Sequence, residues 1–251
     1  MTAVHGTAID IPAADGVADA YLAHPADGNP HPAVLFYQDA YGLRPHLRAM
    51  ADRLAAAGYT VLVPNVFYRH GRTPVVELPD FIDTGADPTI WQRLGPILDS
   101  LTPEQSRRDA DAYLGWLAAS PLAADGPVAV TGYCMGARLV LRTAATHPDR
   151  VAAAAGFHGG MLATEDADSP HLDAGNITAE LYFGHADADR ALPEEQVHRL
   201  EEALTAAGVR HTCEVYEGAR HGYTQADTPA YDRDADERHW AALLSLLKRA
   251  F

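Results

Sequence analysis

The sequence predicts a doubly wound α/β domain, in which helices cover both faces of a mostly parallel sheet. Short, continuous apolar runs that end in glycine or polar residues alternate with amphipathic stretches along the 251 residues. Such runs are typical of strands buried on both faces, and the intervening helices allow successive strands to run parallel. No linker or internal repeat interrupts the alternation, so we expect a single domain, residues 1–251.

The N-terminal part predicts an antiparallel hairpin followed by a strand, helix and strand. Thr7–Ile11 and Val17–Leu22 alternate partly in polarity around an Ala-Asp-Gly turn, which is typical of a hairpin. The apolar run Ala33–Tyr37 predicts a buried strand, and the helix pattern after it ends at Gly58. Another apolar run, YTVLVPN, follows at once and completes a βαβ unit.

The remainder of the chain continues the alternation after one irregular segment. The stretch from Phe67 to about Thr102 contains four prolines and mixed polarity, so we expect a long excursion over a site. A helix is predicted from Pro103 to Ser120, with proline at a favourable first position. The strands and helices expected beyond it are, in order, PVAVTG, CMGARLVLRTAATH, RVAAAAGF, ITAELYFGH, PEEQVHRLEEALTAAG, RHTCEVYEG and DADERHWAALLSLLKRAF.

The composition excludes several classes of partner. The formal net charge of −15 repels phosphate backbones and anionic lipid surfaces, so we expect neither nucleic acid nor membrane as a partner. The beginning of the sequence lacks a basic segment followed by an apolar core, and no apolar run has membrane-spanning length. We therefore expect a cytoplasmic protein whose partner is a small molecule; the oligomeric state is not predicted.

Cys134 lies where a predicted strand meets a predicted helix, between Gly132 and Gly136, in VAVTGYCMGARLVL. Small neighbours allow a sharp, strained turn that presents the side chain at the carboxyl end of the sheet, where ligands bind. The helix N-terminus favours a thiolate, and the amide of Met135 is placed to receive an oxyanion. We interpret Cys134 as a nucleophile; the alternative is a buried cysteine whose glycine neighbours permit close packing.

A nucleophile of this kind needs a histidine base. In this class of fold the nucleophile, the acid and the histidine follow one another along the chain. Among 13 histidines, His221 lies in a loop just after a predicted strand and is followed by Gly222. His158 also lies at a strand end and is its main competitor. We favour His221.

The acid is expected after the strand that contains Gly184, where Asp187 and Asp189 both follow. Spacing from Gly184 favours Asp187, whereas spacing to Pro193 favours Asp189. Either aspartate is also suited to cap the next helix or to face solvent. A metal site made by His185 with the two aspartates is a further alternative, but one histidine and two aspartates are a weak ligand set. We predict no metal.

Five motifs in this order resemble the dienelactone hydrolase family of α/β-hydrolases over nearly the whole chain. They are YQDAYGL, GYTVLVPNVFYR, GYCMGARL, DADRALPEEQ and YEGARHGY. The resemblance implies the α/β-hydrolase fold and a catalytic triad of Cys134, His221 and Asp189, the aspartate being chosen by the family's spacing to the next proline. It also implies that the amides of Met135 and Ala40 hold the oxyanion.

The chain departs from the family's best-known members at two places. Asp39 stands where they carry a glutamate that contacts the resting thiol, and a negative charge there disfavours the thiolate. Those members bind a substrate carboxylate through an arginine just after the catalytic histidine, where this chain has none. The alternative substrate-binding candidates are Arg69, Arg72, Arg220 and Tyr223.

The predicted reaction is hydrolysis of a small ester or lactone through an acyl-enzyme, without a cofactor. A non-catalytic binding protein and a redox-sensing thiol protein are the alternatives, because an exposed thiolate is also sensitive to peroxide. The only other cysteine, Cys213, alternates within a predicted strand and is not an obvious partner for a disulfide.

Overall fold

The computed structural model describes residues 2–251 and contains two compact units, the first ending at Val128 and the second spanning Ala129–Phe251. The single domain predicted for residues 1–251 stays a prediction, and its first residue lies outside the described part. Within residues 2–251, no helix combines the length and the apolar character needed to cross a bilayer. Cytoplasmic localisation stays a prediction.

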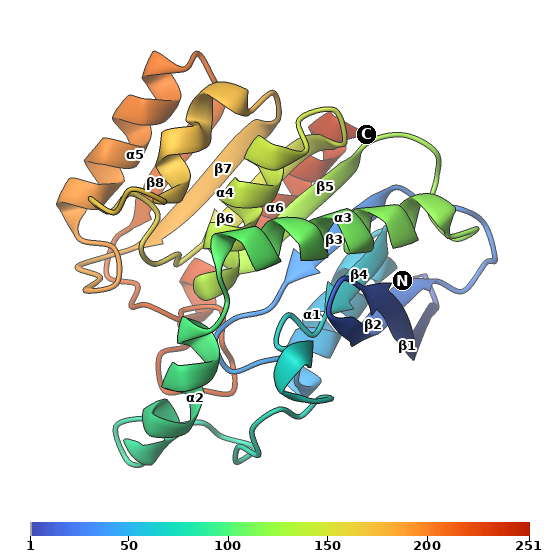
Figure 1. The fold of residues 1–251 in the computed structure, drawn as a ribbon, viewed down its shortest axis with the longest axis horizontal. Helices are drawn as coiled ribbons and strands as arrows, with labels where there is room; N and C mark the ends of the chain where they lie inside the picture. Colours follow the sequence, from blue (N-terminus) through green and yellow to red (C-terminus); the bar gives the residue numbers. More distant parts are fainter. Residues whose placement is uncertain (1) are drawn as a thin grey trace. The chain divides into compact units, whose positions relative to one another are not determined.

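The strands of the first unit lie in the order β1, β2, β4, β3 (Figure 1). β1 and β2 form the predicted antiparallel hairpin, which is longer than the sequence indicated: pairing runs from Val4 with Pro25 to Ala13 with Gly16. β2 pairs antiparallel with β4, and β4 pairs parallel with β3. Every residue of β3 and β4 is buried, as their apolar runs predict. The strand bounds are Val4–Ala13 (β1), Gly16–Pro25 (β2), Ala33–Tyr37 (β3) and Thr60–Pro64 (β4).

Two predicted helices of the first unit begin at prolines. α1 (Pro45–Ala56) connects β3 to β4, and the chain leaves it through Gly58, whose φ of +102° favours glycine. α3 (Pro103–Ala119) begins with a capping box, in which Thr102 and Gln105 each accept a hydrogen bond from the other's backbone amide. Pro103 requires no amide partner at that first position.

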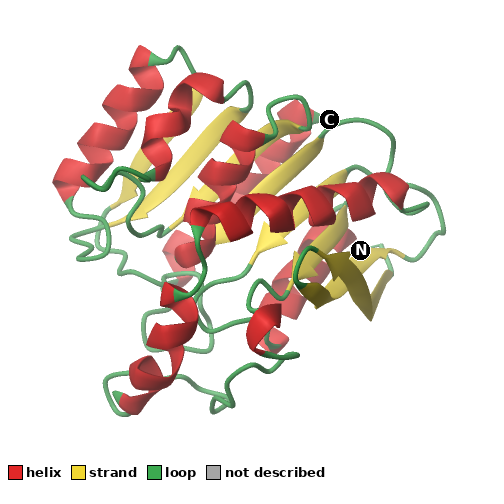
Figure 2. Ribbon diagram, in the orientation of Figure 1, coloured by secondary structure: helices red, strands yellow, loops and turns green. Residues whose placement is uncertain are grey.

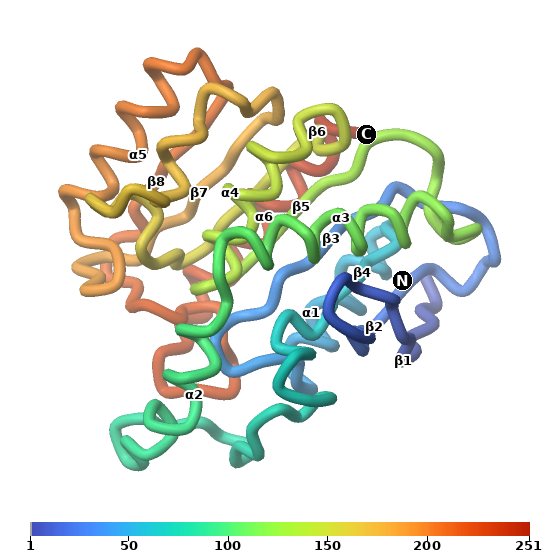
Figure 3. Tube along the Cα trace, in the orientation of Figure 1, coloured from blue at the N-terminus to red at the C-terminus, as the bar shows by residue number. Residues whose placement is uncertain are grey.

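The segment between β4 and α3 is more regular than the sequence predicts. It contains a short 3-10 helix, η1 (Tyr68–His70), and then α2 (Thr89–Asp99), which is labelled in Figure 3. The segment has a small apolar cluster of its own, formed by Ile82, Ile90 and Leu94. The pattern of α2 is concealed because Pro96 lies inside the helix and only Ile90 and Leu94 are buried.

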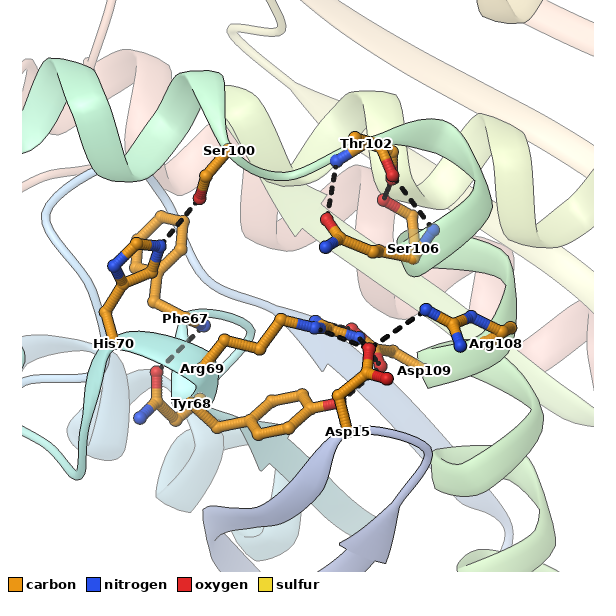
Figure 4. Close-up of polar contacts among 12 residues, drawn as sticks. Asp15, Phe67, Tyr68, Arg69, His70, Ser100, Thr102, Ser106, Arg108 and Asp109 are labelled. Atoms are coloured by element: carbon orange, nitrogen blue, oxygen red, sulfur yellow. Dashed lines mark hydrogen bonds and ion pairs between the residues drawn. The ribbon is translucent and has the colours of Figure 1, made fainter.

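Arg69 anchors this segment through two carboxylates (Figure 4). Its guanidinium makes two parallel hydrogen bonds to Asp109 of α3, at 2.7 and 2.8 Å, and its Nε donates to Asp15 of the hairpin turn at 2.8 Å. Tyr68 donates a further bond to Asp109 at 2.9 Å. These partners occupy the guanidinium and make Arg69 a structural anchor, and its predicted contact with a substrate stays a prediction.

Arg72 is held less firmly. Its guanidinium contacts Asp10 at 2.7 Å, but both side chains are more than half exposed. Exposed ion pairs contribute little to stability and exchange readily with solvent. The predicted contact between Arg72 and a substrate therefore stays a prediction.

Replacing Arg69 by methionine should lower the free energy of unfolding by about 3 kcal/mol, because the buried Asp109 loses its charge partner. The matched variant Arg72→Met should change stability by less than about 1 kcal/mol. Urea unfolding of both variants measures the difference. A stable Arg69→Met protein with a raised KM for carboxylate-bearing esters would instead support a substrate-binding role for Arg69.

The second unit contains parallel strands in chain order. β6 pairs with β7 and β7 with β8, in both cases parallel, and β5 lies next to β6. These elements follow the strand and helix alternation expected from the sequence. Their bounds are Val128–Tyr133 (β5), Met135–Thr146 (α4), Val151–Phe157 (β6), Pro170–Asn176 (the 3-10 helix η2), Glu180–Ala186 (β7), Glu194–Ala206 (α5), His211–Tyr216 (β8) and Arg233–Ala250 (α6).

Helices cover both faces of the strands in this unit, as predicted (Figure 2). Gly156 and Phe157 are consecutive residues of β6, so their side-chain positions point to opposite faces. A Cβ added to Gly156 would lie 3.0 Å from the Cβ of Ala137 in α4. The ring of Phe157 lies 4.4 Å from that of His239 in α6, centroid to centroid. α4 and α6 therefore pack on opposite faces.

Candidate active site

The turn between β5 and α4 holds Cys134 in a strained backbone conformation. Its φ is 53° and its ψ is −116°, values that a residue with a side chain rarely adopts. Met135 is the first residue of α4, so its amide is among those without an acceptor inside the helix. The elbow expected from the sequence is present, and an oxyanion contact from Met135 stays a prediction.

Gly132 is needed because a Cβ at that position would lie 2.5 Å from the carbonyl oxygen of Gly136, and this backbone atom cannot move aside easily. Gly132→Ala should therefore lower stability by about 2 kcal/mol or more and displace Cys134, with a large loss of activity. Gly115→Ala in α3 is the matched control, because a Cβ there meets nothing within 4 Å. Thermal unfolding and ester hydrolysis test both variants. Unchanged activity in Gly132→Ala would contradict the view that the Gly136 carbonyl leaves no room for a Cβ at position 132.

Cys134, Asp189 and His221 lie together, after the carboxyl ends of β5, β7 and β8 respectively. The Nε2 atom of His221 is 3.0 Å from the Sγ atom of Cys134. The Nδ1 atom of the same ring is 2.6 Å from an Asp189 carboxylate oxygen. The Asp189 side chain is buried, whereas that of His221 is 29% exposed, so the histidine is open to a ligand on one side.

The surroundings of His221 favour its charged form. Burial alone would lower the pKa of the imidazole, but the charge of Cys134 and the hydrogen bond that the imidazole donates to Asp189 raise the pKa of His221 to about 10. The imidazole of His221 therefore has sulfur next to one ring nitrogen and a carboxylate next to the other, an arrangement that favours its charged form.

The two candidate aspartates have different partners. Asp189 accepts a hydrogen bond from the amide of Ala191 with one oxygen and faces His221 with the other. Asp187 instead accepts from the amide of Gly218 at 2.8 Å, and its own amide donates to the carbonyl of Ala219 at 2.7 Å. Spacing to the following proline was therefore the better guide to the residue that contacts the histidine, and Asp187 ties its loop to the turn after β8.

The competing histidine, His158, is completely buried beside the site. Its Nε2 atom lies 2.8 Å from the hydroxyl oxygen of Thr224, and its ring packs edge-on against His221 at 5.4 Å between centroids. The geometry places His221, not His158, against the sulfur of Cys134. His158 thus borders the candidate base instead of replacing it.

The residues considered for a metal site do not form one. In the described chain, residues 2–251, no three histidine, cysteine, aspartate or glutamate side chains are grouped so as to hold an ion. Burial lowers the pKa of His185 to about 4, and its ring stacks parallel to that of Phe183. Because Asp189 binds His221 and Asp187 binds a backbone amide, the ligand set suggested by their spacing is not assembled.

Two substrate-binding candidates next to His221 have partners within the protein. Tyr223 is completely buried, and its hydroxyl donates to the carbonyl of Gly184 at 2.9 Å. The Tyr223 side chain is thus occupied inside the protein, and its predicted contact with a substrate stays a prediction. Arg220 donates to the carbonyl of Pro229 at the surface. Its contact with a substrate stays a prediction.

Asp39 lies in the first unit with Ala40, in the loop after β3. Its carboxylate is fully buried and accepts hydrogen bonds from the amide of Tyr41 at 2.9 Å and from the guanidinium of Arg44 at 2.7 Å. Arg44 offsets the negative charge that the sequence led us to consider near the thiol. The thiol-modulating role of Asp39 and the oxyanion contact from Ala40 stay predictions.

Comparison with known proteins adds independent evidence. The sequence pattern of the dienelactone hydrolase family matches residues 18–251. A candidate carboxymethylenebutenolidase from Methylorubrum extorquens is 29% identical over 240 residues, which cover 94% of this chain and 78% of the relative. A similar candidate from Escherichia coli K12 is 29% identical over 236 residues, covering 92% and 82%.

A solved structure extends the likeness to the fold. The crystal structure of a candidate dienelactone hydrolase from Klebsiella pneumoniae superposes with a TM-score of 0.84 at 24% identity, covering 97% of this chain and 98% of that one. The match to the family pattern covers 234 of the 251 residues, which is enough to assign the chain to the family. The chain is a hydrolase of the dienelactone hydrolase family, and it has the α/β-hydrolase fold.

Proposed function

We propose that this protein hydrolyses small carboxylic esters or lactones by transfer of the acyl group to Cys134. The observation that carries the proposal is the placement of His221 between Cys134 and Asp189, at 3.0 and 2.6 Å. The names of the relatives, carboxymethylenebutenolidases, agree with a lactone or ester as the substrate class.

The first half of the reaction forms a thioester. The Cys134 thiolate attacks the substrate carbonyl carbon, and the carbonyl π electrons move onto oxygen to give a tetrahedral oxyanion. The amides of Met135 and Ala40 are the proposed donors to this oxyanion. When the oxyanion collapses, the bond from carbon to the leaving oxygen breaks, and His221 gives its Nε2 proton to that oxygen.

The second half regenerates the enzyme. His221, now neutral, accepts a proton from water as the water attacks the thioester carbonyl. The carbon–sulfur bond then breaks, the acid product leaves, and Cys134 returns to the thiolate beside the protonated histidine. Asp189 accepts from Nδ1–H throughout and so keeps Nε2 directed at the reacting atoms. Water is the only reactant required besides the substrate.

A redox-sensing role is less well supported by the same residues. Burial and the nearby Glu201 raise the pKa of Cys213 to about 12, so it remains a thiol at neutral pH. A thiol in that state is a poor partner for resolving an oxidised Cys134.

The test is a panel of small lactones and esters, each scaffold being offered with a free carboxylate and as its methyl ester. Turnover of at least one member that disappears in Cys134→Ala supports the proposal. The ratio of kcat/KM between the two forms measures whether the protein recognises a carboxylate. Equal rates of turnover by the wild type and by Cys134→Ala with every substrate that is hydrolysed would overturn the proposal.

A further inference from the structure

The carbonyl of Gly184, near the end of β7, is a junction between three segments of the second unit. It accepts hydrogen bonds from the hydroxyl of Tyr223 at 2.9 Å and from the amide of His158 at 2.8 Å. β7 leads into the loop that carries Asp189, and Tyr223 follows His221 by two residues. The junction therefore links the segment of the acid to the segment of the base.

Gly184 is shaped for this contact. A Cβ added there would lie 2.8 Å from the Tyr223 hydroxyl oxygen, and 3.0 and 3.1 Å from ring atoms of Phe157 and Tyr216. Only glycine leaves room for the hydroxyl to reach the carbonyl. The Tyr223 ring is itself fixed, since it stacks on Tyr216 at 5.2 Å and packs edge-on against His158 at 5.0 Å.

The backbone transmits the position of Tyr223 to His221. The amide of Tyr223 donates to the carbonyl of Arg220 at 3.1 Å, which closes a turn around the histidine. Gly222 permits that turn with a φ of +90°. The carbonyl of Tyr223 accepts from the amide of Asp232 at 3.0 Å, where α6 begins. A turn held at both ends has little freedom to move independently of the tyrosine ring.

We propose that Tyr223 is a positioning residue for the reaction. Through the bond between its hydroxyl and the Gly184 carbonyl, it sets the spacing between the His221 ring and the Asp189 carboxylate, and it does so without touching the substrate. This inference rests on the proposed function of Cys134 and His221. Reaction rates depend steeply on such spacing, because a displacement of about 1 Å can cost 100-fold in rate.

The test compares Tyr223→Phe with Tyr216→Phe. Each variant keeps its ring and loses one buried hydroxyl, but the partner of the Tyr216 hydroxyl is the hydroxyl of Tyr182 in β7, at 2.9 Å, and not the Gly184 carbonyl. Tyr223→Phe should lower kcat by about 10- to 100-fold with little change in KM, because the residue orients the base without contacting substrate. Tyr216→Phe should retain kcat.

A spectroscopic readout separates positioning from general stability. The proton on Nδ1 of His221, held between the ring and Asp189, should give a downfield resonance that is absent from His221→Ala. In Tyr223→Phe this resonance should move upfield and exchange faster with water, and in Tyr216→Phe it should stay in place. If the Tyr223 hydroxyl served stability alone, its removal would lower the melting temperature without moving the resonance.

The outcomes distinguish the two claims. Wild-type rates in Cys134→Ala would overturn the proposed function itself. An inactive Cys134→Ala together with wild-type kcat and resonance in Tyr223→Phe would overturn only the positioning role. Gly184→Ala displaces the same hydroxyl by its added Cβ, so folded Gly184→Ala with wild-type kcat would also contradict the inference, whether or not Tyr223→Phe folds.

Discussion

Replacing Cys134 by alanine should reduce hydrolysis of an activated ester by on the order of 10⁴-fold or more, because the reaction loses its nucleophile. The fold should remain, since the substitution removes one partly exposed sulfur atom and keeps a Cβ at the elbow. Steady-state kinetics at neutral pH, together with circular dichroism, measure the two effects. A cysteine that served only packing would show the reverse: a lower melting temperature with activity retained.

Cys213→Ala is the control for that experiment. This thiol lies in β8 and its pKa is raised to about 12 by burial and by Glu201, so it should react slowly with iodoacetamide and contribute nothing to turnover. Labelling at neutral pH should therefore modify Cys134 and abolish activity in parallel. Loss of activity in Cys213→Ala, or labelling confined to Cys213, would contradict the assignment of the nucleophile.

Asp189→Asn should lower kcat by on the order of 10³- to 10⁴-fold. The amide cannot stabilise an imidazolium as a carboxylate does, and its NH₂ group favours the wrong tautomer of His221, with the proton on Nε2. Removing the charge should also lower the pKa of His221, whose rise depends in part on that hydrogen bond. NMR titration of the ring, beside steady-state kinetics, measures both consequences.

Asp187→Asn provides the matched comparison, since it removes the same charge two residues away. An asparagine oxygen can still accept from the Gly218 amide, so the loss of activity should be much smaller than in Asp189→Asn. A larger loss in Asp187→Asn than in Asp189→Asn would show that the closer aspartate in the structure is not the one that supports the base. Small, equal losses would assign both aspartates to structural roles.

The elbow and the histidine beside Cys134 were predictable because the sequence contains local signals for them. Gly132 and Gly136 flank Cys134 at a junction of strand and helix, and His221 follows a strand directly. The choice of Asp189 needed the family's spacing, because two aspartates follow the same strand and local rules favour neither. The parallel order of the strands followed from the alternation of short apolar runs with amphipathic helices.

Contacts between distant residues were not predictable from the sequence. The partners of Arg69 lie 54 and 40 positions away in the chain, and nothing near it indicates that carboxylates will occupy its guanidinium. The hydroxyl of Tyr223 bonds to a carbonyl 39 positions away, a contact that nothing in the sequence around His221 indicates. α2 was missed because Pro96 breaks its pattern.

Rapid acid quench of the enzyme with an activated ester, followed by mass spectrometry of the peptide that contains residues 128–141, detects an acyl group carried on Cys134. We expect the acyl mass on Cys134, with lability to neutral hydroxylamine as expected of a thioester, and loss of the adduct at the rate of turnover. Two results would rule out an acyl group carried on Cys134. One is turnover by Cys134→Ala at the wild-type rate, and the other is an acyl group on a different residue of the wild type that decays at the turnover rate.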